Sequence, residues 1–568
     1  LFRSRHEVLR TVYPDTPDGP VQVILPVTDA VPVVEVVDVA ETEVFAVVAD
    51  FVTGTFDVTT EVPVRARLFR VTDSEFVLAV GVHHISGDGS SMGPLARDVM
   101  TAYAARVAGE APGWSALPVQ YADYAIWQRT VLGDESDESS VLSRQLAYWT
   151  GQLAELPEQL ELPVDRPRPR VASMAGARVP VVVDAVVHAG LVEVARTHNA
   201  TMFMLVHAAF AVLLARLGNT DDVAVGTPYA GRGEAELDDV VGMFVNTLVF
   251  RTRIDAGASF TELLAVVRET DLGAFAHADV PFERLVEVLN PVRSTARHPL
   301  FQVGLSFQNL AATVFELPGL VVAGLDVELG LSQFDLHLIV SDTYTETGAP
   351  AGISGVLTYS TDLFDEATVT GFTDRLARVL AAVAADPGLP VGDIDLLDDA
   401  ERGRVLADWN NTDHPVDPGV TVLSLFETTV ARYPERVAVL DAATGVEWSY
   451  REFASRVYRW ARFLVSRGVR VGSLVAVAIP RSTEQLVAMY AVVAAGGGYV
   501  PVDPDHPADR TGYVLSTADP VLALTTTGVS VDTGAPVVAV DEVDVAGFAD
   551  TPLTEAERGV VRAGHPVY

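Results

Sequence analysis

The sequence contains neither cysteine nor lysine, so all 39 of its basic residues are arginine. Without cysteine, these residues hold no disulfide framework, no thiolate nucleophile and no cysteine-ligated zinc. Without lysine, they hold no Schiff-base lysine, no kinase-type lysine and no lysine of a phosphate-binding loop. Several classes of enzyme are therefore excluded before any motif is considered.

Basic residues are also few relative to acidic ones. The 39 arginines and the 76 Asp and Glu residues give a formal net charge of −37. This charge argues against nucleic acid or an anionic membrane as a main partner. The longest apolar stretches, 201–217 and 486–502, are interrupted and fall short of the roughly 18 apolar residues of a membrane span. The chain begins without Met, and both ends look like cuts through a longer polypeptide, for which we expect a cytoplasmic location.

Hydrophobic residues make up 49% of the chain, which is enough for several packed cores. The apolar run 76–82 predicts a buried strand, and the spacing of apolar residues over 92–107 predicts a helix with one apolar face. Strands and helices alternate over the first 400 or so residues, which favours α/β layers. Proline-rich residues 163–170 and turn-rich residues 398–418 are typical of joints between domains.

The most informative local feature is the stretch Val-His-His-Ile-Ser-Gly-Asp-Gly at 82–89, between the predicted strand and the predicted helix. Adjacent residues of a strand point to opposite faces, so only one of His83 and His84 can face a given cleft. No second histidine cluster accompanies this pair. We therefore predict no metal site here.

This stretch matches the string HHxxxDG and resembles the signature of condensation domains of nonribosomal peptide synthetases, which are related to chloramphenicol acetyltransferase. Further stretches follow in that family's order over residues 1 to about 400, although the family's first motif is missing. These stretches are RHEVLRT at 5–11, YADYAIWQ at 121–128, VGMFVNTL at 241–248, HADVPFE at 277–283 and HPLFQV at 298–303.

A second resemblance begins beyond residue 418. The stretches at 425–427, 448–453 and 492–504 are similar to the opening of an adenylation domain. That family's phosphate loop, amino-acid pocket, ribose ligand and C-terminal lysine have no counterpart in these residues. We therefore expect this part to be inactive in amino-acid activation and to bind neither ATP nor Mg²⁺.

The resemblances imply an α/β fold in which two chloramphenicol acetyltransferase-like lobes form a V-shaped condensation domain. The N-lobe, truncated at its N-terminus, would span 1–168 and the C-lobe 169–397. A linker at 398–418 would lead to a truncated adenylation domain at 419–568, with a partial α/β N-terminal subdomain.

The implied reaction joins a donor acyl or peptidyl thioester to an acceptor aminoacyl thioester, forming a peptide bond. The resemblance implies that both substrates arrive on the phosphopantetheine arms of carrier domains, the donor carrier upstream and the acceptor carrier downstream. They would meet in a tunnel, with the adenylation domain in cis. No cofactor bound by these residues is implied.

The resemblance maps the family's catalytic histidine onto His84, which would act either as a base or by positioning the amine. His83 is expected to be structural and to point into the lobe. Asp88 is expected to fix the turn by pairing with an arginine, Arg10 first and Arg5 second. The competing interpretation is that Asp88 orients His84 directly.

Four further residues complete the predicted site. Gly89 would let the backbone approach the substrate, and its amide could face the developing oxyanion. Asn246 and Thr247 would line the channel, although ordinary backbone capping is an equal alternative. Ser90 stands where the family often has Trp, and the loss of this large aromatic would either widen one end of the channel or alter partner docking.

Two other functions stay open. An epimerisation domain shares the HHxxxDG string, but it ordinarily follows a carrier domain, whereas here the adenylation part follows directly. A catalytically silent docking module is the other alternative, and the presence of His84, Asp88 and Gly89 argues against it.

Overall fold

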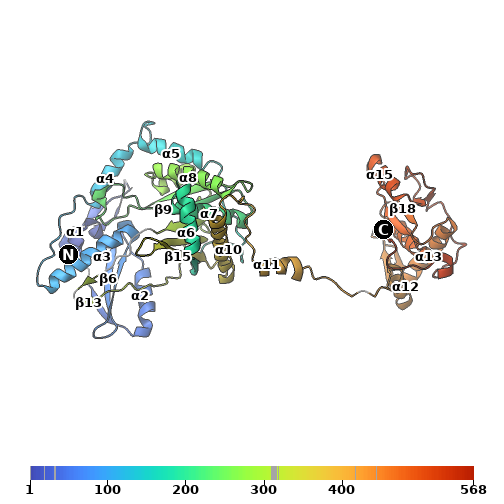
Figure 1. Cartoon of the computed structure of the whole chain (residues 1–568), viewed down its shortest axis with the longest axis horizontal. Coiled ribbons are helices and arrows are strands. Elements are labelled where there is room, and N and C mark those ends of the chain that lie inside the picture. The colour runs from blue at the N-terminus through green and yellow to red at the C-terminus, as the bar shows by residue number, and fades with distance from the viewer. Residues whose placement is uncertain are drawn as a thin grey trace. The chain divides into compact units, whose positions relative to one another are not determined.

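The computed structural model describes all residues except 1, 18, 31–33, 309–315, 318, 416 and 443. The chain divides into two compact units, Leu1–Arg404 and Val405–Tyr568 (Figure 1). The division lies inside the segment 398–418 that the sequence marks as a joint. Each unit is described by itself.

A six-stranded mixed sheet organises the first unit, in the order β10-β9-β11-β14-β15-β8. The three central strands β9, β11 and β14 run parallel to one another, and the other neighbours pair antiparallel. Their bounds are β8 Gly176–Val183, β9 Asp222–Tyr229, β10 Asn246–Arg253, β11 Val303–Phe307, β14 Leu336–Tyr344 and β15 Pro350–Ser360.

Helices cover one face of this sheet and form the main core with it. They are α6 Ala185–Thr197, α7 Met202–Gly218, α8 Phe260–Ala276 and α10 Glu366–Ala385. Helix α7 is apolar on nearly all sides, and its residues from Met204 to Ala215 are all buried, as expected of a helix in the middle of a core. Thr201 begins this helix by accepting a hydrogen bond from the Met204 amide.

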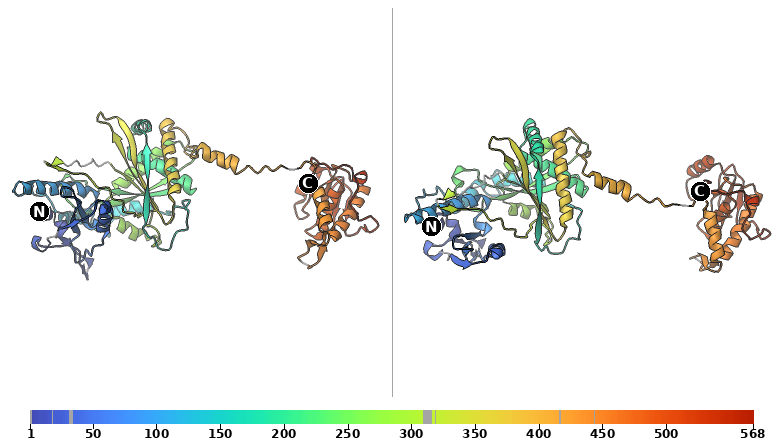
Figure 2. Two further views of the ribbon diagram at one scale, coloured as in Figure 1. Left: turned by 90° about the horizontal axis from the view of Figure 1, so that it is seen from below. Right: turned by 60° about the horizontal axis from the view of Figure 1, so that its bottom comes forward.

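The N-terminal part of this unit lies on the opposite side of the large sheet from α10 (Figure 2). It holds a three-stranded sheet, ordered β5-β6-β7, and several helices. The main elements are β5 Glu35–Asp38, α2 Val44–Thr53, β6 Val64–Arg70, β7 Phe76–Val82, α3 Met92–Val107, α4 Tyr121–Leu132 and α5 Val141–Gln152.

The strand predicted at 76–82 and the helix predicted at 92–107 are both present, as β7 and α3. Their predicted burial was wrong in part. Phe76 and Leu78 of β7 are exposed, so this strand is not buried on both faces. In α3, Asp98 lies among the buried residues because it pairs with Arg5 and His6.

Shorter elements complete the first unit. They are α1 Phe2–Arg5, β1 Thr11–Val12, β2 Asp15–Thr16, β3 Gly19–Pro20, β4 Val23–Ile24, α9 Phe282–Leu289, β12 Glu316–Leu317, β13 Leu320–Val321 and α11 Asp399–Gly403.

The second unit has a parallel sheet, ordered β19-β18-β20-β21, and a small hairpin β16-β17. The strands are β16 Val437–Leu440, β17 Glu447–Ser449, β18 Leu474–Val477, β19 Gly498–Pro501, β20 Leu522–Thr525 and β21 Val537–Ala539. The helices are α12 Val422–Arg432, α13 Tyr450–Ser466, α14 Thr483–Ala494, α15 Ala508–Ala518 and α16 Glu555–Arg558.

Three consecutive glycines join α14 to β19. Gly496 has a φ of +88°, a conformation that favours glycine. A Cβ atom on Gly497 would lie 2.9 Å from the carbonyl oxygen of Ser473, and one on Gly498 would lie 3.0 Å from that of Pro566. These glycines therefore allow neighbouring backbone segments to approach closely.

Within the described residues, no single helix is long and apolar enough to cross a bilayer. Helices α6 and α7 together reach that length and composition, but the chain bends by 107° between them.

The core of the first unit contains a buried ion-pairing contact. His207 Nδ1 of α7 lies 3.0 Å from Asp271 Oδ1 of α8, and both side chains are fully buried. Removing one member of such a pair leaves a buried polar group without its partner.

We expect Asp271→Ala to lower the free energy of unfolding of the first unit by about 3 kcal/mol. The measurement is the thermal or denaturant midpoint of the unit's transition. The matched control is Glu193→Ala, which removes an exposed partner of Arg196 on α6 and should leave the midpoint in place. Equal shifts in the two variants would contradict the importance of the buried contact.

Candidate active site

The HHxxxDG stretch forms the turn between β7 and α3. The chain makes two short 3₁₀ segments, His84–Ser86 and Gly89–Ser91, before α3 begins at Met92. His83 Nδ1 accepts a hydrogen bond of 3.1 Å from the Ile85 amide and so caps the first segment. Its ring packs edge to face against Phe56, with 5.9 Å between centroids. The structure thus places His83 in a supporting position.

His84 and Gly89 are the exposed members of this turn. A Cβ atom added to Gly89 would meet nothing within 4 Å, so the space beside this backbone is open. Asp88 between them is only 4% exposed. The turn therefore presents one histidine and one bare stretch of backbone, and it buries its acid.

Asp88 holds the turn in place from beneath. Its Oδ1 accepts hydrogen bonds of 2.8 Å from both the amide and the hydroxyl of Ser91, and its Oδ2 accepts one of 2.9 Å from the Phe244 amide. Arg232 supplies the counter-charge, with Nη2 3.2 Å from Oδ1. Among the described residues, Asp88 makes no hydrogen bond with His84, which favours the turn-fixing interpretation over direct orientation.

The predicted arginine partners of Asp88 were wrong. Arg10 instead pairs with Glu7 at 2.8 Å and donates to the Leu25 carbonyl. Arg5 instead pairs with Asp98 at 2.7 Å. Both arginines are engaged by acids near their own segment or on α3, whereas Arg232 reaches Asp88 from 144 residues away in sequence.

Ser91 connects the turn to the segment before β10. Its hydroxyl oxygen lies 2.9 Å from the Gly242 carbonyl oxygen, 3.1 Å from the Gly242 amide and 3.0 Å from Arg232 Nη2. We call the set Asp88, Ser91, Arg232, Gly242 and Phe244 the clamp. The hydrogen bonds that join Asp88, Ser91, Gly242 and Phe244 are buried, and those of Arg232 are partly buried, so the clamp fixes the turn that carries His84.

Tyr121 of α4 supports the clamp from the side. Its hydroxyl donates a hydrogen bond of 2.8 Å to the Met243 carbonyl, and burial raises the pKa of Tyr121, which keeps the hydroxyl protonated as a donor. A Cβ atom on Gly242 would lie 2.2 Å from the Tyr121 ring, so only glycine fits there. The guanidinium of Arg232 lies over the Phe244 ring at 4.1 Å.

Two roles were predicted for Asn246, lining the channel or capping backbone groups, and the structure shows the capping contacts. Its Nδ2 donates hydrogen bonds to the carbonyls of Ala278 (2.8 Å) and Val280 (2.6 Å). Its Oδ1 accepts from the amides of Phe282 and Thr247. Both ends of the amide are therefore engaged with backbone. Thr247 and Ser90 are half-buried, and their channel roles stay predictions.

Ser91, Arg232, Tyr121 and Gly242 were not predicted as site residues. Tyr121 lies in the motif at 121–128 and Gly242 in the motif at 241–248. Their place near the site could have been inferred if these motifs were assumed to pack against the HHxxxDG turn. Arg232 lies outside every motif and carries no such signal. In the described part of the chain, no group of three potential ligands from His, Cys, Asp and Glu could hold a metal ion.

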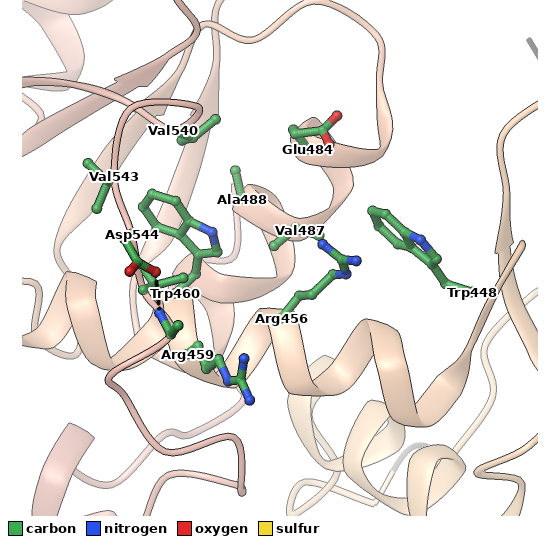
Figure 3. A pocket seen from close by; sticks show the side chains of 12 residues that line it. Trp448, Arg456, Arg459, Trp460, Glu484, Val487, Ala488, Val540, Val543 and Asp544 are labelled. Carbon is green, nitrogen blue, oxygen red and sulfur yellow. Dashed lines mark hydrogen bonds between the residues drawn. The ribbon is translucent and has the colours of Figure 1, made fainter. Parts of the chain in front are cut away.

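The second unit contains a separate cleft of about 260 Å³ between α13, α14 and the segment after β21 (Figure 3). Arg456 lies over the Trp448 ring at 4.2 Å, and Trp460 forms part of the same wall. The charged lining residues balance, two arginines against two acids, and we assign no reaction to this cleft. These four are Arg456, Arg459, Glu484 and Asp544.

Known proteins resemble this chain along its whole length. The family model for the condensation domain matches residues 1–406, and that for AMP-binding enzymes matches residues 426–561. A probable nonribosomal peptide synthetase of Salinispora arenicola is 46% identical over 100% of this chain, which spans only 7% of that protein.

Solved structures agree with the fold. The X-domain from teicoplanin biosynthesis is 35% identical, with a TM-score of 0.66 over 70% of this chain and 88% of its own. A four-domain nonribosomal peptide synthetase bound to AMP and glycine is 24% identical and has a TM-score of 0.72 over 95% of this chain and 41% of its own. These likenesses confirm the predicted class of two acetyltransferase-like lobes plus part of an adenylation subdomain.

The match over residues 1–406 covers most of the chain, and the AMP-binding match follows it directly. The chain therefore belongs to the nonribosomal peptide synthetases, as a condensation domain followed by part of an AMP-binding domain.

Proposed function

We propose that the first unit forms a peptide bond between a carrier-bound donor acyl or peptidyl thioester and a carrier-bound acceptor aminoacyl thioester. The observation that carries this proposal is the exposure of His84 on a turn whose acid is buried in the clamp. Family membership supports an amide-forming acyltransferase in general. The clamp is what makes His84 a fixed group rather than a mobile surface side chain.

The reaction balances without a further reagent. The acceptor α-amine attacks the donor carbonyl, a C–N bond forms, the C–S bond breaks, and the amine proton leaves with the released thiol. An α-amine with a pKa of about 7.7–8.0 is partly neutral at pH 7, and a thioester is already activated. Alignment can lower the barrier by roughly 7–11 kcal/mol.

His84 acts on the attacking amine in this proposal. As a base it would accept the amine proton, a role worth about 10²–10⁴ in rate. As a positioning group it would hold the amine, and later the tetrahedral species, by hydrogen bonding. Gly89 leaves open backbone beside it, where the carbonyl oxygen of the donor can approach.

The substrates are proposed to arrive on phosphopantetheine arms, from an upstream donor carrier and a downstream acceptor carrier. Relatives of this chain are much longer synthetases, which supports partners within the same assembly. The AMP-binding part in cis contributes no reacting group to this proposal, and no cofactor is assigned to the first unit.

We expect His84→Ala to reduce amide formation by at least about 100-fold, because the group that acts on the amine is removed. His84→Gln distinguishes the two roles: it keeps hydrogen bonding without titrating, so activity well above the Ala variant favours positioning. The measurement is product analysis by mass spectrometry with both carriers loaded.

His198→Ala is the control for this experiment, since His198 is an exposed histidine at the end of α6. Near-normal turnover by His84→Ala would overturn the proposal. If the unaltered chain gives an epimerised thioester and no amide, the unit is an epimerisation domain. If it gives neither the amide nor the epimerised thioester, the result favours a docking module.

We expect Asp88→Ala to lower both folded yield and rate, with a loss of about 3 kcal/mol in unfolding free energy, because Arg232 is left buried and unpaired. Adding Arg232→Met should restore part of the stability without restoring the rate. The control is Arg97→Met, which breaks an exposed pair with Asp239. An Asp88→Ala protein with native stability and no activity would contradict the turn-fixing role.

A further inference from the structure

The six-stranded sheet buries one face and leaves the other partly accessible. Along β14, Leu336, Leu338 and Val340 enter the helix-covered core, while His337 and Ile339 between them stay partly accessible. On the neighbouring strand β15, Leu357 and Tyr359 enter the same core, while Thr358 between them stays partly accessible. We call the side of the sheet that carries His337 and Ile339 the accessible face.

The N-terminal part is tied to this sheet at both of its edges. On the β10 side the tie is the clamp, whose Arg232, Gly242 and Phe244 lie in the segment that joins β9 to β10. At the β8 edge, Arg178 pairs with Asp326 at 3.1 Å and with Glu328 at 3.7 Å. Val327, between those acids, packs into the N-terminal cluster around Phe69. The central strands β11 and β14 therefore lie within the sheet between the two sides at which it is tied.

Strand register places one row of residues on the accessible face. His337 is opposite Gly304 on β11 and Thr358 on β15, and Thr358 is opposite Arg178 on β8. Residues that are directly opposite in neighbouring strands point to the same face. His337 thus faces the same side as the Arg178 tie, towards the N-terminal part that carries His84.

Ser306 and His337 form a polar pair in the middle of this face. The Ser306 hydroxyl lies 2.8 Å from His337 Nε2, and the Phe334 ring stands edge-on at 5.3 Å. A Cβ atom on Gly304 would lie 2.8 Å from His337 Cδ2, so the imidazole has room there only because residue 304 of β11 has no side chain. Both side chains of the pair are half-buried and therefore still reachable.

The pair carries no charge at neutral pH. Burial lowers the pKa of His337 to about 4, so the imidazole is neutral. After the hydrogen bond between them is made, a serine hydroxyl and a neutral imidazole still offer donor and acceptor capacity to a third group. The charged member of the row, Arg178, is already engaged by two acids.

We propose that Ser306 and His337 form a specificity site, which binds an uncharged polar group, a hydroxyl or an amide, on the acyl chain of a carrier-bound substrate. This inference rests on the proposed function. A charged group would have to be desolvated beside a neutral pair, which is costly, whereas a hydroxyl or amide can exchange hydrogen bonds with it. A site built to hydrogen-bond a substrate discriminates strongly against isosteres that cannot.

The test uses the full chain with carriers loaded in turn with isosteric acyl groups, threonyl against valyl and asparaginyl against leucyl, as donor and as acceptor. We expect the unaltered protein to favour the polar member of at least one pair by about 10-fold or more in kcat/KM. Ser306→Ala and His337→Phe should each bring that ratio close to one by slowing the polar substrate alone.

Ser341→Ala is the matched control, because Ser341 lies further along β14 on the same face as His337. It should leave the ratio unchanged. Equal loss for both members of a pair would show that Ser306 and His337 serve only the fold. A ratio near one in the unaltered protein, or an unchanged ratio in both variants, would overturn the specificity site.

A binding measurement separates this inference from the proposed function. The probes are the same acyl groups joined to pantetheine by an amide, which cannot react. Suppose that the unaltered chain shows no turnover but binds the polar probe more tightly, and that the Ser306 and His337 variants abolish this preference. That result would reject only the proposed function. Turnover that depends on His84, without such a preference, would reject only the specificity site.

Discussion

The structure of the proposed active site depends on one buried carboxylate. Asp88 receives hydrogen bonds from its own turn through Ser91 and from the second half of the unit through Phe244, and Arg232 balances its charge. A buried acid with that many partners cannot move without leaving several polar groups unpaired. The exposed His84, four residues earlier, thereby gains a fixed position from a residue that is itself buried.

The absence of lysine gives every cationic role to arginine, and the buried contacts show what that allows. Arg251 donates to Asp222 and also to the carbonyls of Gln152 and Ala154. Arg232 likewise divides its donors between Asp88, Ser91 and backbone carbonyls. A lysine ammonium could not match these contacts, in which one planar guanidinium donates to several acceptors in different directions. Arginine thus links distant segments, even though its use throughout says little about the reaction itself.

Local sequence predicted the elements that carry the site, and it failed where the partner lies far away in the chain. A continuous apolar run predicted β7, and the spacing of apolar residues predicted α3. Arg10 was predicted as the partner of Asp88, but it pairs with Glu7, three residues earlier in the chain. Arg232 lies 144 residues from Asp88 and outside every motif, so only the folded chain shows their contact. For Asn246, capping was one of the two predicted roles, but the sequence did not name its partners, which follow more than 30 residues later.

The whole chain is strongly acidic, but the acid of the HHxxxDG turn, Asp88, is paired with Arg232. A free carboxylate beside the attacking amine would stabilise its ammonium form and so raise its pKa, which would remove the nucleophile. The clamp prevents this by burying Asp88 against Arg232, and on the accessible face the Ser306–His337 pair is neutral. In the proposed reaction, the burial that fixes the turn would also keep this negative charge away from the amine. Positioning and electrostatics are two consequences of a single contact, so a substitution that frees the Asp88 carboxylate should impair both together.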